Sequence, residues 1–148
     1  MALHLHVSVG ISIGALVVLR IIWRSLNEKP KPESGSKLSH LAARLGHYAL
    51  YGVMILMPVT GYLGTGTDTE FFFSFDIPKF ESTSFYTLLV ADWMGLDFDT
   101  FEAPVDFLHK EILGKWLVWM LIAGHAAAAG YHHMVKRDRT LAKMTTGN

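Results

Sequence analysis

The sequence predicts an all-α membrane protein with three transmembrane helices, at about residues 3–23, 40–63 and 108–135. The first observation is that 51% of the 148 residues are hydrophobic and that they lie in three long blocks. The second is that each block has about the 20 residues that, at about 1.5 Å per residue, cross a bilayer core of about 30 Å. Because the chain is short, we expect residues 1–148 to form one domain.

The composition narrows the chemistry that is available to the chain. The absence of cysteine excludes disulfides, covalent c-type haem attachment and cysteine-ligated iron–sulfur or zinc sites. The formal net charge is zero, so nucleic acid is not indicated as a partner. Eight histidines remain as candidate metal ligands, and most of them lie at or inside the three apolar blocks.

The first two blocks each contain a histidine close to one end. His6 is the one strongly polar residue in the interior of the first block, residues 5–19, and a polar group at membrane depth indicates function because it is costly to leave unsatisfied. Gly10 and Gly14, four residues apart, predict close packing against another helix. The second block carries His47 near its start and Pro58 near its end, where we expect a kink.

The third block carries four histidines that a plain membrane anchor does not need. His109 stands at its start, His125 lies inside it, and His132 and His133 lie at its end. The residues after His125, which are Ala126–Gly130, leave room for a neighbouring helix or a flat cofactor. A histidine beside such small side chains suggests a haem ligand.

The charges predict the orientation in a bacterial inner membrane. Between Arg20 and Arg44 six basic residues face two acidic ones, which places the Pro-containing loop 25–39 in the cytoplasm. Basic residues also follow the third block, so the C-terminus is expected to be cytoplasmic. Residues 65–107, the acidic loop, hold nine acidic residues and one basic residue, which predicts a periplasmic location. Their many aromatic side chains favour contact with the membrane surface or with the helix ends, and residues 84–94 are expected to form a short interfacial helix.

This topology divides the histidines into two groups. His6 and His109 both lie at the outer face and can approach one iron atom from two sides. His47, His125 and His132 lie towards the inner face. Ligation by two histidines leaves no open position on a haem iron, so such a haem transfers electrons and does not bind oxygen. Two haems near opposite faces would form a path for electrons across the membrane.

The residues leave three points open. His47 is a ligand, a contact of a haem propionate, or a packing residue. His109 and His125 are sixteen residues apart, which is a difference of about 160° on a regular helix, whereas fourteen would place them within about 40°. Either the helix bulges, or His109 precedes its regular part, or His109 is not a ligand. A ligating histidine also needs an acceptor for its second nitrogen, and Ser8 or a backbone carbonyl is the candidate near His6.

Three segments resemble a known family. They are HVSVGISIG with the following VLRIIWR, LGHYALYGVMILMPVTGYL, and LHKEILGKW with the later GHAAAAGYHHMVKRDRTLAKM. With them the chain resembles the bacterial cytochrome b561 family and, more distantly, the cytochrome b subunits of nickel–iron hydrogenase and formate dehydrogenase. The resemblance implies a four-helix bundle with two b haems, in which the three blocks correspond to helices 2–4. It implies that His6 and His109 hold the outer haem, and that His125 and a histidine of a preceding helix hold the inner haem. That helix is expected to be truncated, lost or supplied by a separate chain, so one or two haems are expected.

By the same resemblance, such proteins carry electrons between the quinone pool and a partner on one side of the membrane. Arg20 and His132 lie at the inner boundary, where they pair with haem propionates, shape a quinone site, or mark a plain positive-inside boundary. One alternative is an anchor and electron-transfer subunit for a dehydrogenase or hydrogenase-type redox partner. Another is a superoxide:quinone oxidoreductase, against which the acidic loop argues because it repels an anion. A non-haem histidine metal site is the remaining alternative.

Overall fold

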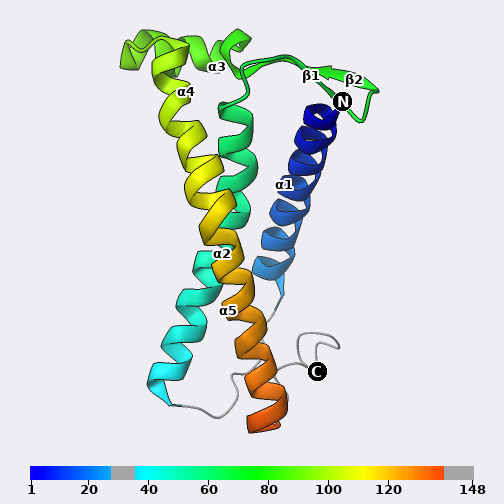
Figure 1. Cartoon of the computed structure of the whole chain (residues 1–148), viewed down its shortest axis with the longest axis vertical. Coiled ribbons are helices and arrows are strands. Elements are labelled where there is room, and N and C mark those ends of the chain that lie inside the picture. Colours follow the sequence, from blue (N-terminus) through cyan, green and yellow to red (C-terminus); the bar gives the residue numbers. More distant parts are fainter. Residues whose placement is uncertain (28–35, 139–148) are drawn as a thin grey trace.

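Three long helices run side by side along the long axis of the molecule (Figure 1). The computed structural model describes residues 1–27 and 36–138. The helices are α1 (Ala2–Leu26), α2 (Lys37–Leu63) and a last helix that is continuous over Phe98–Lys136. α2 contacts both of the others and is therefore the central helix. The prediction of an all-α membrane protein is confirmed.

Two of these helices, α1 and Phe98–Lys136, are long and apolar enough to cross a membrane by length and composition. Their most apolar windows are only 17% and 6% buried within the protein, respectively. Large side chains such as Leu16 and Trp119 point outwards. The core helix of a soluble protein would bury such side chains, whereas lipid covers them in a membrane. α2 is 27 residues long and contains more polar side chains, and its assignment as a third span stays a prediction.

The last helix begins ten residues earlier than the sequence indicated. Its first residue is Phe98 rather than residue 108, because the Asp97 carboxylate accepts a hydrogen bond from the backbone N–H of Thr100 (2.9 Å) and caps the helix. Four parts follow one another without a break: α4 (Phe98–Phe107), a π-helical segment (Leu108–Leu117), α5 (Val118–Tyr131) and a π-helical turn (His132–Lys136). Residues 98–107 of the acidic loop are thus helical.

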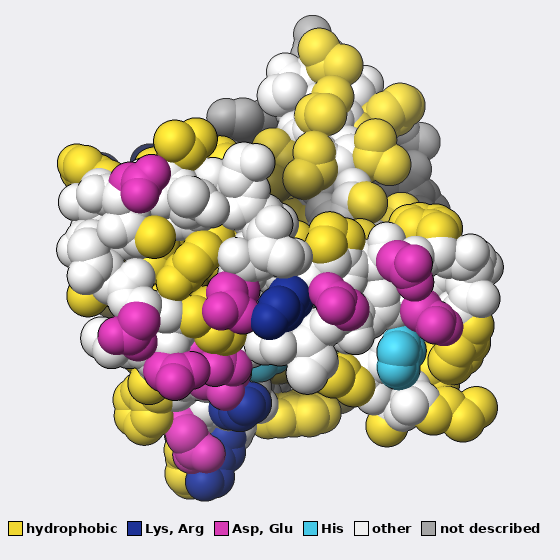
Figure 2. Space-filling view, turned by 90° about the horizontal axis from the view of Figure 1, so that it is seen from above, with side chains coloured by type: hydrophobic (Ala, Val, Ile, Leu, Met, Phe, Trp, Pro, Cys, Tyr) yellow, Lys and Arg dark blue, Asp and Glu magenta, His cyan; other side chains and the backbone are white. Residues whose placement is uncertain are grey.

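The rest of the acidic loop covers one end of the helices, which we call the outer end and which also carries the N-terminus (Figure 1). It holds a hairpin of β1 (Thr69–Phe71) and β2 (Phe75–Ile77), a short 3-10 turn (Phe80–Ser82), and α3 (Ser84–Tyr86) extended by a π-helical turn (Thr87–Met94). The predicted short helix 84–94 is confirmed, and the hairpin was not foreseen. Figure 2 shows acidic and hydrophobic side chains mixed over this end.

A small apolar core joins the rest of the acidic loop, which we call the cap, to the helices. Phe80, Val90 and Phe98 are buried together, and Tyr62 near the end of α2 packs against them. Two side chains of α1 hold the hairpin from the other side. Ser8, which is fully buried, accepts a hydrogen bond from the backbone N–H of Phe72 (2.8 Å), and His4 Nδ1 accepts one from the N–H of Glu70 (3.0 Å). The cap therefore has a defined position on α1.

Candidate functional site

His6 and His109 face each other at the outer end of the helices. The centres of their rings are 6.1 Å apart and the ring planes are nearly perpendicular, at 85°. Both histidines line a cavity of about 600 Å³ bounded by α1, α2 and the last helix. Most of the lining is apolar, with Val7, Val53 and Met57 among its residues. The outer histidine pair that the sequence predicted is thus brought together.

The π-helical segment explains how His109 reaches this position. Of the sixteen residues from His109 to His125, the first half lies in the π-helical segment Leu108–Leu117. A π-helix turns by only about 82° per residue, which reduces the angular difference between the two histidines from about 160° to about 20°. The helix therefore contains the bulge that was one of the three alternatives. Both histidines then face α2.

Two adjacent residues of α2 hold the His109 ring. The hydroxyl oxygen of Thr60 lies 3.1 Å from His109 Nδ1. Gly61 lies directly against the ring, because a Cβ atom there would be 2.9 Å from His109 Cε1. Sequence reasoning missed both residues, although they lie in the segment MPVTGYL that contributed to the resemblance.

The arrangement suits a haem iron. A porphyrin supplies four of the six iron ligands, so two imidazoles complete the set. With metal–nitrogen bonds of about 2.0 Å on opposite sides, the ring centres of two ligating imidazoles are about 6 Å apart, as they are here. Gly10, one helical turn from His6, also lines the cavity, and a Cβ atom there would meet nothing within 4 Å, so flat space is open beside the pair.

A bare metal ion suits the site less well. Zinc sites in proteins use three or four protein ligands, which is more than a pair of histidines supplies. Among residues 1–27 and 36–138, no group of three or more histidine, aspartate or glutamate side chains is placed to hold a metal ion. The site chemistry therefore favours the haem over the non-haem alternative.

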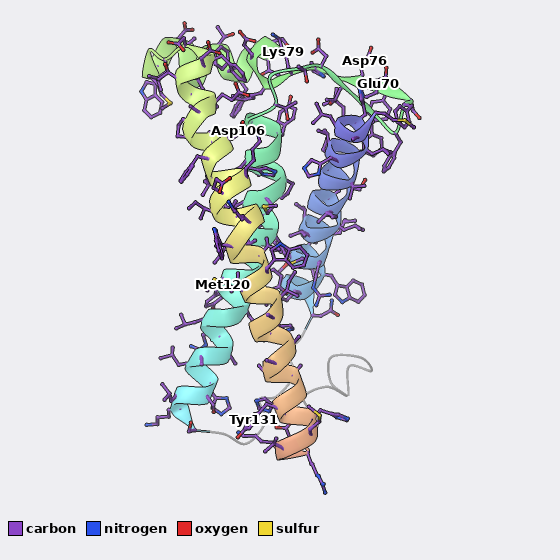
Figure 3. All side chains as sticks on the ribbon, viewed as in Figure 1. Glu70, Asp76, Lys79, Asp106, Met120 and Tyr131 are labelled. Atoms are coloured by element: carbon purple, nitrogen blue, oxygen red, sulfur yellow. The ribbon has the colours of Figure 1, made fainter. Side chains whose placement is uncertain are left out.

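Charged side chains lie at the outer mouth of the cavity. Asp106, on α4, faces α2 (Figure 3), and its Oδ1 atom would lie 2.9 Å from a Cβ atom at Gly64. Lys110 forms an ion pair with Asp106 at 2.5 Å and also lines the cavity. The mouth thus holds one basic side chain, which is suited to a carboxylate such as a haem propionate.

The inner histidines His47 and His125 form a pair as well. The resemblance implied a partner for His125 on a preceding helix, and the residues left the role of His47 open. In the structure the ring centres of His47 and His125 are 5.8 Å apart, with ring planes at 60°. The reason is that α5 packs against α2, which carries His47. His125 remains exposed, in line with the exposed Ala126–Ala128 that follow it.

The remaining predicted residues do not join this pair. His132 Nδ1 lies 2.5 Å from the carboxylate of Asp138. Arg20 is exposed on α1, and within the described residues no hydrogen bond or ion pair involves its side chain. Ser8 does not serve His6 as an acceptor, because its hydroxyl is engaged by the backbone of the hairpin and of α1.

The fold and the site together define a class of protein. It is a helical membrane protein in which histidines of different helices lie in pairs. The family described as prokaryotic cytochrome b561 matches residues 1–147. Cytochrome b561 homolog 2 of Escherichia coli (strain K12) is 33% identical over 148 residues, which covers 95% of this chain and 69% of the relative. No solved structure matches the chain significantly.

The chain belongs to the prokaryotic cytochrome b561 family. The family identifies it as a membrane electron carrier that binds haem b. The resemblance drawn from the three segments is thereby confirmed.

Proposed function

We propose that this chain carries electrons through a b haem held between His6 and His109, and exchanges them with a quinone and a redox partner protein. The observation that carries the proposal is the 6.1 Å separation of the two rings across a largely apolar cavity. When bound, the haem supplies a reversible one-electron couple at the iron. His6 and His109 would hold the haem, and ligation by both imidazoles would leave no position on the iron for oxygen.

The protein's own residues supply position and environment. His6 on α1 and His109 on the last helix come from two elements that both pack against α2, so the ligand pair also ties the bundle together. Val7, Val53 and Met57 give the cavity an apolar lining. A low-dielectric lining and a fixed ligand geometry set the reduction potential of such a centre.

The pair His47 and His125 is the second position that we propose for a haem. Its ring-centre distance of 5.8 Å is close to the about 6 Å expected of two axial imidazoles. His125 is exposed, so a histidine of a helix from another chain also has access to it. Arg20 and His132 lie towards the same end of the helices, where a quinone headgroup or haem propionates would find hydrogen-bond donors.

We further propose that the acidic loop 65–107 faces the periplasm of a bacterial inner membrane, with loop 25–39 and the C-terminus in the cytoplasm. The charge difference between the two ends supports this orientation. Figure 2 shows how widely the acidic side chains are spread over the outer end. Such a surface attracts a basic redox partner and repels superoxide, so electron transfer is favoured over superoxide oxidation.

Haem content of purified variants tests the proposal. His6→Ala and His109→Ala are expected to lose the outer haem and its reduced b-type absorption, while His133→Ala, which changes an exposed histidine, keeps it. His125→Ala is expected to keep the outer haem, because the outer pair does not depend on it, and to lose only haem held at the inner pair. Membrane insertion of each variant is verified first. Full haem retention in His6→Ala together with loss in His125→Ala would show that the inner pair is the haem site and that the outer assignment is wrong.

A further inference from the structure

The buried hydroxyl of Thr60 lies between the backbone of its own helix and the outer histidine His109. Thr60 is only 5% exposed. Its Oγ1 atom lies 2.7 Å from the carbonyl oxygen of Leu56 and 3.1 Å from His109 Nδ1. No other hydroxyl among the described residues hydrogen-bonds a histidine ring.

The chemistry of these three groups decides where the protons are. A carbonyl oxygen only accepts, so the 2.7 Å contact with Leu56 requires the Thr60 hydroxyl hydrogen. The hydroxyl has no second hydrogen and must accept from His109. In a neutral imidazole one nitrogen carries the hydrogen and the other has the lone pair. His109 therefore carries its hydrogen on Nδ1, and its Nε2 lone pair is left for a ligand in the cavity.

We propose that Thr60 is a positioning residue for the outer haem. Thr60 selects the Nδ1–H tautomer of His109 and, through His109, tunes the reduction potential of the haem. The proposal rests on the proposed function, since it takes His109 as an axial ligand. An acceptor on Nδ1–H makes the imidazole a more basic ligand. A more basic ligand favours ferric over ferrous iron and lowers the midpoint potential.

The two axial histidines differ in this respect. Within residues 1–27 and 36–138, the His6 side chain has no hydrogen-bond partner, whereas His109 has the Thr60 hydroxyl and the backbone of Met57. Gly61 leaves room for the ring at this position, because a Cβ atom there would lie 2.9 Å from His109 Cε1. The potential of the outer haem is therefore set through His109 more than through His6.

Thr60→Val removes the hydroxyl but keeps the shape of the side chain, and Thr60→Ser restores the hydroxyl. The matched control is Thr65→Val. Thr65 is also buried, lines the same cavity and donates to its own helix, to the carbonyl of Gly61 (2.6 Å), but does not contact His109. Redox titration should show a higher midpoint potential in Thr60→Val than in the parent and in Thr65→Val, with Thr60→Ser close to the parent. Equal potentials in Thr60→Val and Thr65→Val would overturn the inference.

A second measurement does not need a variant or bound haem. Nitrogen NMR of the protein without haem, labelled in histidine, reports which ring nitrogen of His109 carries the hydrogen. The Nδ1–H form is expected, and a predominant Nε2–H form overturns the inference even if Thr60→Val fails to fold. His109→Ala distinguishes the proposed function from the proposed role of Thr60. Retention of the outer haem in His109→Ala would refute the proposed function itself. Loss of that haem, with no shift of the midpoint potential in Thr60→Val, would refute only the role of Thr60.

Discussion

Gly61→Ala tests the geometry of the outer site without touching a ligand. The added methyl group would lie 2.9 Å from His109 Cε1, 3.4 Å from Nδ1 and 3.6 Å from Nε2. Carbon atoms in favourable contact are about 3.5–4.0 Å apart, so the ring has to move by about 0.6 Å or more. The ring cannot move freely, because Thr60 and the π-helical backbone hold it.

A shift of this size displaces the His109 ring from its position 6.1 Å from the His6 ring. Changes in the groups that orient a metal ligand lower metal affinity by about 10- to 100-fold, which corresponds to about 1.4–2.8 kcal/mol of binding free energy. We expect Gly61→Ala to weaken haem binding within that range. The assay is a haem titration of the apoprotein in detergent, followed through the reduced absorption band.

Gly52→Ala is the matched control. Gly52 lies in the same helix, and a Cβ atom there meets nothing within 4 Å. Both substitutions bring the same gain of about 1 kcal/mol in helix propensity, so a difference between them reports the contact with His109 alone. Equal haem affinities of the two variants would show that the position of the His109 ring does not matter for binding, and the assignment of His109 as a ligand would be wrong.

Three further outcomes are expected. Cysteine at position 82 should be labelled from outside intact cells and cysteine at position 36 should not; the opposite result reverses the proposed topology. Ser8→Ala leaves the N–H of Phe72 without its acceptor, which should cost about 1–3 kcal/mol and speed hydrogen exchange in the hairpin, whereas Ser12→Ala, whose hydroxyl bonds only its own helix, should not. Hydrogen bonds from the backbone and side chain of Thr100 lower the pKa of Asp97, so its cap is fully formed above the ordinary value of 3.8 and is lost as the pH falls through the lower folded-state pKa. The protection of the Thr100 amide relative to its intrinsic exchange rate should follow that titration and should not change over this pH range in Asp97→Asn.

Local patterns in the sequence determined the class of the protein and the long helices, and they predict a depth for each histidine. Hydrophobic block length and the charges beside it are properties of neighbouring residues, so they are readable without a fold. The pairing of His6 with His109 could be predicted because both begin an apolar block at the same face. The helix over 84–94 was predictable from another local feature, the many aromatic side chains of the acidic loop.

The hairpin at 69–77 was not predictable, because its turn lacks the usual signal. Phe72 and Phe73 have positive φ angles of 45° and 60°, a conformation that hairpin turns usually assign to glycine or asparagine. The turn is held instead by the buried hydroxyl of Ser8, 64 residues away in the chain. Only tertiary contact brings these groups together.

Tertiary structure also decided which way the site histidines face. The direction of His109 depends on rotation accumulated along the last helix, and the π-helical segment changes that rotation by more than a quarter turn, from about 160° to about 20°. The Thr60 hydroxyl lies 49 residues from His109 in the chain, and the meeting of His47 with His125 depends on the packing of α5 on α2. The sequence could place these residues at a depth in the membrane, but their mutual orientation follows from helix packing, which no local pattern encodes.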